Sequence, residues 1–266
     1  MPKKEKPIGE CRLCLREREL QLSHLLPRAV YDYLRQGDPG KNLPVIMTDR
    51  ITVKDNEQLK DHLLCEECED RFNKNGESYA LSVMWTGERF KLLDQLNAAS
   101  AIGRHGNSRF SGRDIGVDMD KLAYFALSVF WRAGAHKWKS KYTVKYNYSI
   151  DLKDYLEPIR RFLLGGSRPE NVSVMITVAI DLHSRHSVYA PTRTQGVPLV
   201  GFGFLTCGIH FTLFMQKPIP PNYQRFCSVR SSGRPIFWRD LSAQTLHSVE
   251  RLYKVGRVAR NMKPND

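Results

Sequence analysis

The residues of this chain whose types and spacing most clearly suit chemistry are four cysteines. Cys11 and Cys14 form one Cys-x-x-Cys motif, and Cys65 and Cys68 form another. Two such motifs supply four thiolates at the spacing of a tetrahedral zinc site. Zinc with four thiolate ligands has no open position for water, so this site is expected to stabilise the fold and not to catalyse a reaction.

The other two cysteines, Cys207 and Cys227, lie in an apolar strand-like segment and in a loop with aromatic neighbours. Since the chain carries a metal-type cysteine signature elsewhere, we expect free thiols here and no disulfide. The chain has no apolar run of membrane-spanning length and no signal-peptide core near its start. These features predict a cytoplasmic protein without a membrane partner.

The positive charge of the chain is unevenly distributed. The 266 residues carry a formal net charge of +13. Residues 1–90 hold 15 Lys and Arg against 16 Asp and Glu, which leaves 26 basic and 12 acidic residues for positions 91–266. Attraction to a polyanion must therefore come mostly from the C-terminal part. DNA is the expected partner and RNA the second candidate, while a generally basic domain without such a partner is the alternative.

The elements expected near the cysteines place a histidine close to them. Glu19–His24 alternates like a short strand, and Pro27 suits the first turn of a helix that runs to Leu34. A further helix is expected from Cys68, with a pause near Gly76 and a continuation to about Leu96. His24 would then lie at the end of its strand. Two short strands are expected between the cysteine pairs, at 45–47 and 50–53.

The remaining pattern predicts an α+β protein of two domains. Residues 1–97 would form the zinc module with its following helix, and the glycine-rich residues 98–117 a linker or long loop. Residues 118–266 would form a basic domain of helices and an antiparallel sheet that binds nucleic acid or a partner protein. Its expected helices are 119–138, 150–164 and 241–255, and its expected strands are 172–180, 197–207 and 209–215.

The motifs around the cysteines resemble those of the treble-clef members of the HNH, or ββα-metal, nucleases. In that superfamily two Cys-x-x-Cys knuckles bracket a strand that bears a histidine, and the second knuckle opens a helix. The resemblance lies within residues 8–80, and it is also seen to little-characterised bacterial HNH-like proteins found near phage-defence genes. The matching motifs are Cys11-x-x-Cys14, Ser23-His24-Leu-Leu-Pro27 and Leu63-Leu-Cys65-Glu-Glu-Cys68-Glu69.

This resemblance implies a divalent-metal-dependent endonuclease that hydrolyses DNA phosphodiesters, with a role in antiphage defence. It gives His24 the role of the general base and Glu69 a part in holding Mg²⁺ or Mn²⁺. Ser23 stands where related nucleases usually have an acid or a second histidine as a metal ligand. Glu69 stands where they usually have His or Asn.

The chemistry of the residues agrees with those roles. A neutral imidazole can take a proton from water near neutral pH, and hard oxygen ligands suit Mg²⁺ or Mn²⁺. Glu69, Asn73 and Glu77 recur at four-residue steps, which puts them on one face if the helix continues through Gly76. In the alternative interpretation, His24 hydrogen-bonds a backbone carbonyl, Glu69 is a helix N-terminal acid, and the other two lie on a solvated face.

Basic residues that suit phosphate contacts fall into two groups. Arg71 and Lys74 follow the second cysteine pair, and the segment 131–148 interleaves basic and aromatic residues, which favours phosphate contact with base stacking. A helix end followed by a strand with inward tyrosines explains the same segment. The candidates in it are Arg132, Lys137, Lys139 and Lys141.

Three functional hypotheses follow from the sequence. The first is the HNH-like endonuclease. The second is a non-catalytic, zinc-stabilised module that binds nucleic acid. The third is a subunit of a larger complex that needs a partner protein or a second copy of the chain.

Overall fold

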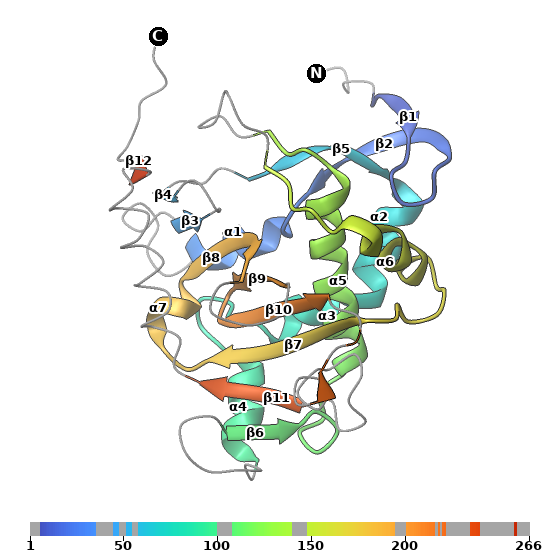
Figure 1. The fold of residues 1–266 in the computed structure, drawn as a ribbon. Helices are drawn as coiled ribbons and strands as arrows, with labels where there is room; N and C mark the ends of the chain where they lie inside the picture. Colours follow the sequence, from blue (N-terminus) through green and yellow to red (C-terminus); the bar gives the residue numbers. More distant parts are fainter. Residues whose placement is uncertain are drawn as a thin grey trace.

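The computed structural model describes residues 6–35, 58–99, 108–139, 148–194 and 201–215, and shorter segments at 45–47, 52–54, 218, 220–221, 235–239 and 258–259. Over these residues the chain is an α+β protein with a small and a large sheet (Figure 1). The fold class predicted from the sequence is confirmed at this level. None of the described helices combines the length and apolar character needed to cross a membrane.

The small sheet carries the cysteine pairs. Its strands are β1 (Ile8–Glu10), β2 (Glu17–His24) and β5 (Lys60–Cys65), which pair antiparallel in the order β1-β2-β5. The first cysteine pair lies in the turn between β1 and β2, and the second lies where β5 ends and the next helix begins. The predicted strand is confirmed as β2, and His24 is its last residue.

The helix predicted from Cys68 to Leu96 is one helical run followed by a break. It comprises α2 (Glu66–Phe72), a π-helical turn η1 (Asn73–Glu77) and α3 (Ser78–Val83). The prediction of helix over residues 84–90 is wrong, because Gly87 has a φ of 101° and the chain reverses through a bridge between Trp85 and Phe90. A separate helix, α4 (Lys91–Ala98), follows. Before this run, α1 (Arg28–Arg35) confirms the predicted helix after Pro27.

The longest described helix, α5 (Met119–Ala135), runs through the middle of the molecule toward β2 and β5 (Figure 1). It begins as predicted, since the Asp118 carboxylate accepts a 3.0 Å hydrogen bond from the Lys121 backbone N–H. It ends three residues before the predicted Trp138. Its apolar residues face the large sheet, where Phe125 and Phe130 contact Phe204 with ring centroids 6.1 and 5.0 Å apart.

The large sheet has nine strands over the described residues, in the order β12-β4-β3-β8-β9-β10-β7-β11-β6. The strands are β3 (Val45–Met47), β4 (Thr52–Lys54), β6 (Ser108–Ser111), β7 (Val172–Ala179), β8 (Ser187–Arg193), β9 (Gly201–Thr206), β10 (Ile209–Met215), β11 (Pro235–Arg239) and β12 (Val258–Ala259).

The pairing in this sheet is mixed and not wholly antiparallel as predicted. The central strands β8, β9, β10 and β7 are antiparallel neighbours. At the flanks, β3 joins β8 and β11 joins β7 in parallel. The strand pattern of a segment reports which face is buried but not which distant segment pairs with its edge. Strands β3 and β4 come from the N-terminal part, so both parts of the chain contribute to one sheet.

Shorter helices complete the described fold. The predicted helix 150–164 is a 3₁₀ turn, η2 (Lys153–Tyr155), followed by α6 (Leu156–Leu163). It ends as predicted at two glycines, of which Gly165 has a φ of 100°. Helix α7 (Leu182–Arg185) and strands β1, β6, β8 and β11 were not predicted. The predicted helix 241–255 lies outside the described residues.

The contact between η1 and α5 depends on a glycine. A Cβ atom on Gly76 would lie 2.7 Å from the Phe125 backbone nitrogen and 2.9 Å from the Lys121 carbonyl oxygen. Both atoms belong to the backbone of a helix, so neither can move aside without disturbing α5. Gly76 therefore sets how closely the helical run after the cysteines approaches α5.

We expect Gly76→Ala to destabilise the protein by about 1–3 kcal/mol, because the added methyl group must push the two helices apart. Urea unfolding followed by circular dichroism would measure the loss as a lower midpoint at an unchanged slope. Lys74→Ala is the matched control in the same turn, where the side chain is exposed and its ion pair with Asp70 is worth about 0.5 kcal/mol or less. Equal stability of Gly76→Ala and the control would contradict the close-packing argument.

Candidate metal centre and the polar cluster beside it

The four cysteines predicted to bind a metal ion come together in the structure. The Sγ atoms of Cys11, Cys14, Cys65 and Cys68 all lie within 4.8 Å of one another. Cys14 is half-buried and the other three are buried. All five described cysteines are free thiols. The arrangement therefore fits one metal ion held by four sulfur ligands.

The backbone around the cysteines is shaped to present these sulfur atoms. The Leu15 N–H donates to the Cys11 carbonyl at 2.8 Å, and Leu15 takes a φ of 60°, which closes the first turn tightly. The Cys65 N–H donates to the Cys11 Sγ at 3.3 Å and joins the two pairs. A hydrogen bond from Cys68 and backbone N–H groups lower the pKa of the Cys11 thiol to about 4. The site thus favours a thiolate at Cys11, the form that binds metal, whereas burial and the neighbouring Cys11 raise the pKa values of Cys65 and Cys68.

An arginine from the C-terminal part supports the first cysteine turn. Arg160 on α6 donates a 2.5 Å hydrogen bond from Nη1 to the Leu13 carbonyl oxygen. The same guanidinium is held by both carboxylate oxygens of Glu157, at 2.6 and 2.9 Å. Arg160 therefore holds the first cysteine turn in place, although it lies almost 150 positions away in the chain.

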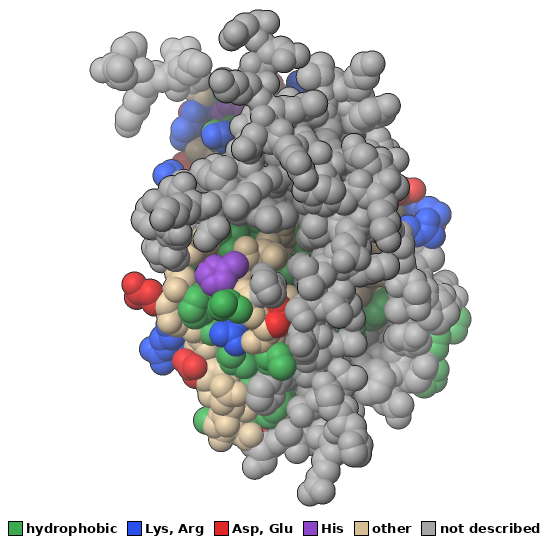
Figure 2. Space-filling model, turned by 90° about the vertical axis from the view of Figure 1, so that its left-hand side faces the viewer, with side chains coloured by type: hydrophobic (Ala, Val, Ile, Leu, Met, Phe, Trp, Pro, Cys, Tyr) green, Lys and Arg blue, Asp and Glu red, His purple; other side chains and the backbone are tan. Residues whose placement is uncertain are grey.

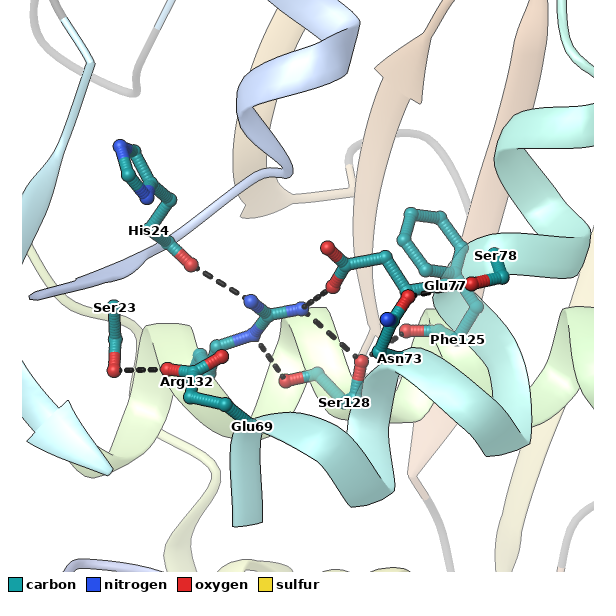
Figure 3. Close-up of polar contacts among 9 residues, drawn as sticks. All are labelled: Ser23, His24, Glu69, Asn73, Glu77, Ser78, Phe125, Ser128 and Arg132. Atoms are coloured by element: carbon teal, nitrogen blue, oxygen red, sulfur yellow. Dashed lines mark hydrogen bonds and ion pairs between the residues drawn. The ribbon is translucent and has the colours of Figure 1, made fainter. Parts of the chain in front are cut away.

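Arg132 on α5 is the centre of a polar cluster beside the cysteines (Figure 3). The residue is 1% exposed. Its Nη1 donates to the His24 carbonyl oxygen at 2.7 Å, and its Nη2 donates to the Glu77 carboxylate at 3.2 Å. Ser128 accepts two further hydrogen bonds from the guanidinium. This placement contradicts the predicted contact of Arg132 with nucleic acid, because the side chain points into the protein.

Glu69 faces Ser23 and not the imidazole of His24 (Figure 3). The buried Ser23 hydroxyl donates to the Glu69 carboxylate and accepts a 3.2 Å hydrogen bond from the Leu64 N–H. Burial raises the pKa of the Glu69 carboxyl, although the charge of Arg132 and the Ser23 hydrogen bond oppose the shift. Glu69 therefore connects α2 to β2 inside the protein.

The π-helical turn separates the three residues that were predicted to share one helix face. Glu69 points to Ser23, Glu77 points to Arg132, and the exposed Asn73 accepts a 2.5 Å hydrogen bond from the Ser78 hydroxyl. The wider turn changes the rotation per residue, so four-residue steps no longer align the side chains. In Figure 3 the guanidinium of Arg132 lies between His24 on one side and Glu77 and Asn73 on the other, and Glu69 lies beside Ser23.

The imidazole of His24 is half-buried and makes no hydrogen bond to a described residue. Burial lowers its pKa below the usual value, and the positive charges of Lys60, Arg132 and Arg28 lower it further. The negative charge of Glu77 opposes this shift. His24 is therefore held by its backbone while its ring remains neutral near neutral pH and free to accept a proton.

A second group of metal ligands is not assembled among the described residues. The cysteines form the one cluster in which three or more His, Cys, Asp or Glu side chains bring ligand atoms together. His24, Glu69 and Glu77 do not form such a cluster in that part of the chain. Any ion near His24 would therefore need water molecules to complete its coordination.

The other predicted phosphate contacts have separate environments. Arg71 donates to the Leu164 carbonyl oxygen at 3.4 Å, and Lys74 lies 3.3 Å from the Asp70 carboxylate. Lys137 and Lys139 are exposed after the end of α5. Lys141 lies outside the described residues.

The end of α5 also reaches β5. His136 Nε2 and the Asp61 carboxylate are 3.0 Å apart. Burial would raise the pKa of Asp61, but hydrogen bonds from the His62 N–H and from His136, with the charge of Lys139, lower it overall. Lys139 therefore lies close to β5, the strand that pairs with β2, which carries His24.

Charged side chains of both signs lie on the side of the molecule that Figure 2 shows. Figure 2 shows the side of the molecule at the left of Figure 1, where described hydrophobic, basic and acidic side chains are mixed.

Sequence reasoning did not predict the internal roles of Ser23, Ser128 and Arg132. A usable signal existed for one of them, because a lone arginine in the apolar run of α5, four residues after a serine, must find partners when buried.

Comparisons with protein-family models, with curated proteins and with solved structures found no match to this chain.

We expect Cys68→Ser to lose the bound metal and to unfold at lower denaturant, because three thiolates hold a structural ion poorly. Metal content of the purified protein, measured by mass spectrometry, should fall from about one ion per chain to well below that. Cys207→Ala is the control, since this buried cysteine lies outside the cluster and should leave the metal content unchanged. Full metal content in Cys68→Ser would contradict the assignment.

We expect Arg132→Met to destabilise the protein by about 3 kcal/mol or more, because it leaves the carboxylate of Glu77 and the carbonyl of His24 without their donor. Chemical denaturation would measure the change. Arg161→Met is the matched control, because Arg161 is 73% exposed and its ion pair with Glu157 should contribute less than about 1 kcal/mol. Similar small losses in both variants would show that the cluster around Arg132 is not a structural centre.

Proposed function

We propose that the chain is a zinc-stabilised, HNH-like endonuclease that hydrolyses DNA phosphodiesters with the help of a divalent cation. The observation that carries this proposal is the state of His24. Its backbone is fixed by the buried Arg132, whereas its imidazole is unbonded among the described residues and has a lowered pKa. A histidine placed only to support a strand would be expected to use its ring nitrogens for hydrogen bonds.

The metal at the four cysteines is proposed to be zinc. Four thiolate ligands from two Cys-x-x-Cys motifs are typical of structural zinc, and the mutual spacing of the sulfur atoms fits one ion. The small sheet with its cysteine turn and the helix after the second pair supports the proposed treble-clef module. In this module the zinc ion holds β2, β5 and α2 together and takes no part in the reaction.

The reaction would use His24 as the general base. Phosphodiester hydrolysis needs a group that takes a proton from the attacking water, and a neutral imidazole can do so. Glu77 and Asn73, which lie across the Arg132 guanidinium from His24, offer hard oxygen atoms, and one carboxylate oxygen of Glu77 is occupied by Arg132. When bound there, Mg²⁺ or Mn²⁺ would neutralise charge that develops on the phosphate.

Glu69 has a different role in this proposal from the one suggested by the motif. Its carboxylate is engaged by the Ser23 hydroxyl, so we assign it to the support of β2 beneath His24. Lys137 and Lys139 remain candidates for phosphate contacts, because both are exposed near β5. DNA as the substrate and a role in antiphage defence rest on the motif resemblance.

A second candidate function is a non-catalytic module that binds nucleic acid, alone or as a subunit of a complex. The observation that favours it is the lack of a second metal-ligand cluster among the described residues. In that case His24 would contact a phosphate group and would not activate water.

We expect the purified chain to nick supercoiled plasmid DNA in Mg²⁺ or Mn²⁺, and His24→Ala to lower the rate by about 100-fold to 10,000-fold through loss of the base. Gel electrophoresis of time courses would measure both rates. His62→Ala is the control, because the exposed His62 lies two residues along β5 from the partner of His24 and donates to the Leu20 carbonyl oxygen. Zinc content should be the same in all three proteins.

The pH dependence follows from the direction of the shift at His24. Since its folded pKa lies below the usual value of about 6.5, the imidazole is mostly neutral at that pH and becomes fully neutral as the pH rises. Cleavage should therefore reach its plateau at a lower pH than an ordinary histidine would give, and fall as the pH drops and His24 becomes protonated. Absence of cleavage by a folded, metal-loaded wild type would favour the binding module instead.

A further inference from the structure

The surface beside His24 carries a lysine that has no acidic partner. Lys60 is the antiparallel partner of His24 in the β2–β5 pair, so the two side chains extend from the same face of the sheet. In such pairs the Cβ atoms are about 4.5–5.5 Å apart. Lys60 is exposed, and it forms no ion pair within the part of the chain that the structure describes.

An arginine also lies near His24. Arg28 opens α1, four residues after His24, and the three residues between them are buried, which fixes the path of the connection. The Arg28 side chain is 74% exposed and lies 3.9 Å from the Asp32 carboxylate, at the limit of an ion pair. Such an exposed pair contributes little and leaves Arg28 available to another anion.

The charges around His24 leave an excess of positive charge at the surface. Arg132 and Glu77 also face His24, but they are paired with each other at 3.2 Å. Lys60 and Arg28 are both near enough to affect the titration of the imidazole. Exposed cations elsewhere are more closely paired, such as Arg161 with Glu157 at 2.9 Å and Arg168 with Asp120. Two available cations near a neutral imidazole suit a bound anion.

We propose that Lys60 and Arg28 bind the backbone phosphates of a nucleic acid beside His24. This inference rests on the proposed function for the identity of the anion, and it adds two contact residues to the site. A phosphodiester backbone supplies anions at regular spacing, and each contact with a cation releases condensed counterions. The nucleic-acid strand would thus lie across the end of β2 and the start of β5.

The test is the salt dependence of binding to a fluorescent duplex DNA, measured by anisotropy without added divalent cation. The proteins are the full-length wild type, Lys60→Ala, Arg28→Ala and the double variant. Each single substitution should lower the magnitude of the slope of log affinity against log salt by about one, and the double variant by about two. Lys91→Ala is the matched control, because this exposed lysine lies on α4 at the far end of the molecule from β5 (Figure 1).

The outcomes separate this inference from the proposed function. Unchanged slopes in Lys60→Ala and Arg28→Ala, an equal change in Lys91→Ala, or no binding by the wild type would each overturn the inference. Plasmid nicking is measured on the same proteins. Reduced slopes without any nicking would support the phosphate contacts and overturn the proposed nuclease function. Nicking with unchanged slopes would support the nuclease function and overturn the phosphate contacts.

Discussion

The buried guanidinium of Arg132 is the interaction on which the rest of the site depends. A charge removed from water is tolerated only if hydrogen bonds and an opposite charge replace the lost solvation. Arg132 meets this condition by binding the end of β2, the π-helical turn and its own helix at once. If these elements separated, the guanidinium of Arg132 would be exposed or would lose its hydrogen-bond partners. Helix α5 therefore determines where His24 and Glu77 lie relative to each other.

The cysteine cluster provides a second constraint that acts on the same strands. A metal ion at the four sulfur atoms would fix the start of β2 and the end of β5, while Arg132 fixes the other end of β2. The Arg160 contact with the Leu13 carbonyl oxygen connects this centre to α6. The small sheet therefore does not need a large core of its own, which is expected for a metal-held module.

The sequence was sufficient for features that depend on local residue order. The grouping of the four cysteines, the strand that ends at His24 and the start of α5 at residue 119 are confirmed, because each needs only neighbouring residues. The mixed order of the large sheet could not be predicted, since its flanking strands come from distant segments. The apolar run around Arg132 signals an enclosed arginine, but it does not indicate which distant groups, here His24 and Glu77, the guanidinium would bind.

The π-helical turn shows why the fold and the site have to be considered together. An uninterrupted helix would have placed Glu69, Asn73 and Glu77 in one row, which is the arrangement that residue spacing alone predicts. The turn instead brings the Gly76 backbone against α5 and directs Glu77 to Arg132. A single departure from regular helix thus creates both the closest helix contact and the carboxylate beside His24. Because π-turns are uncommon and are found frequently at functional sites, this geometry favours a functional role for the Glu77 carboxylate over a purely solvated one.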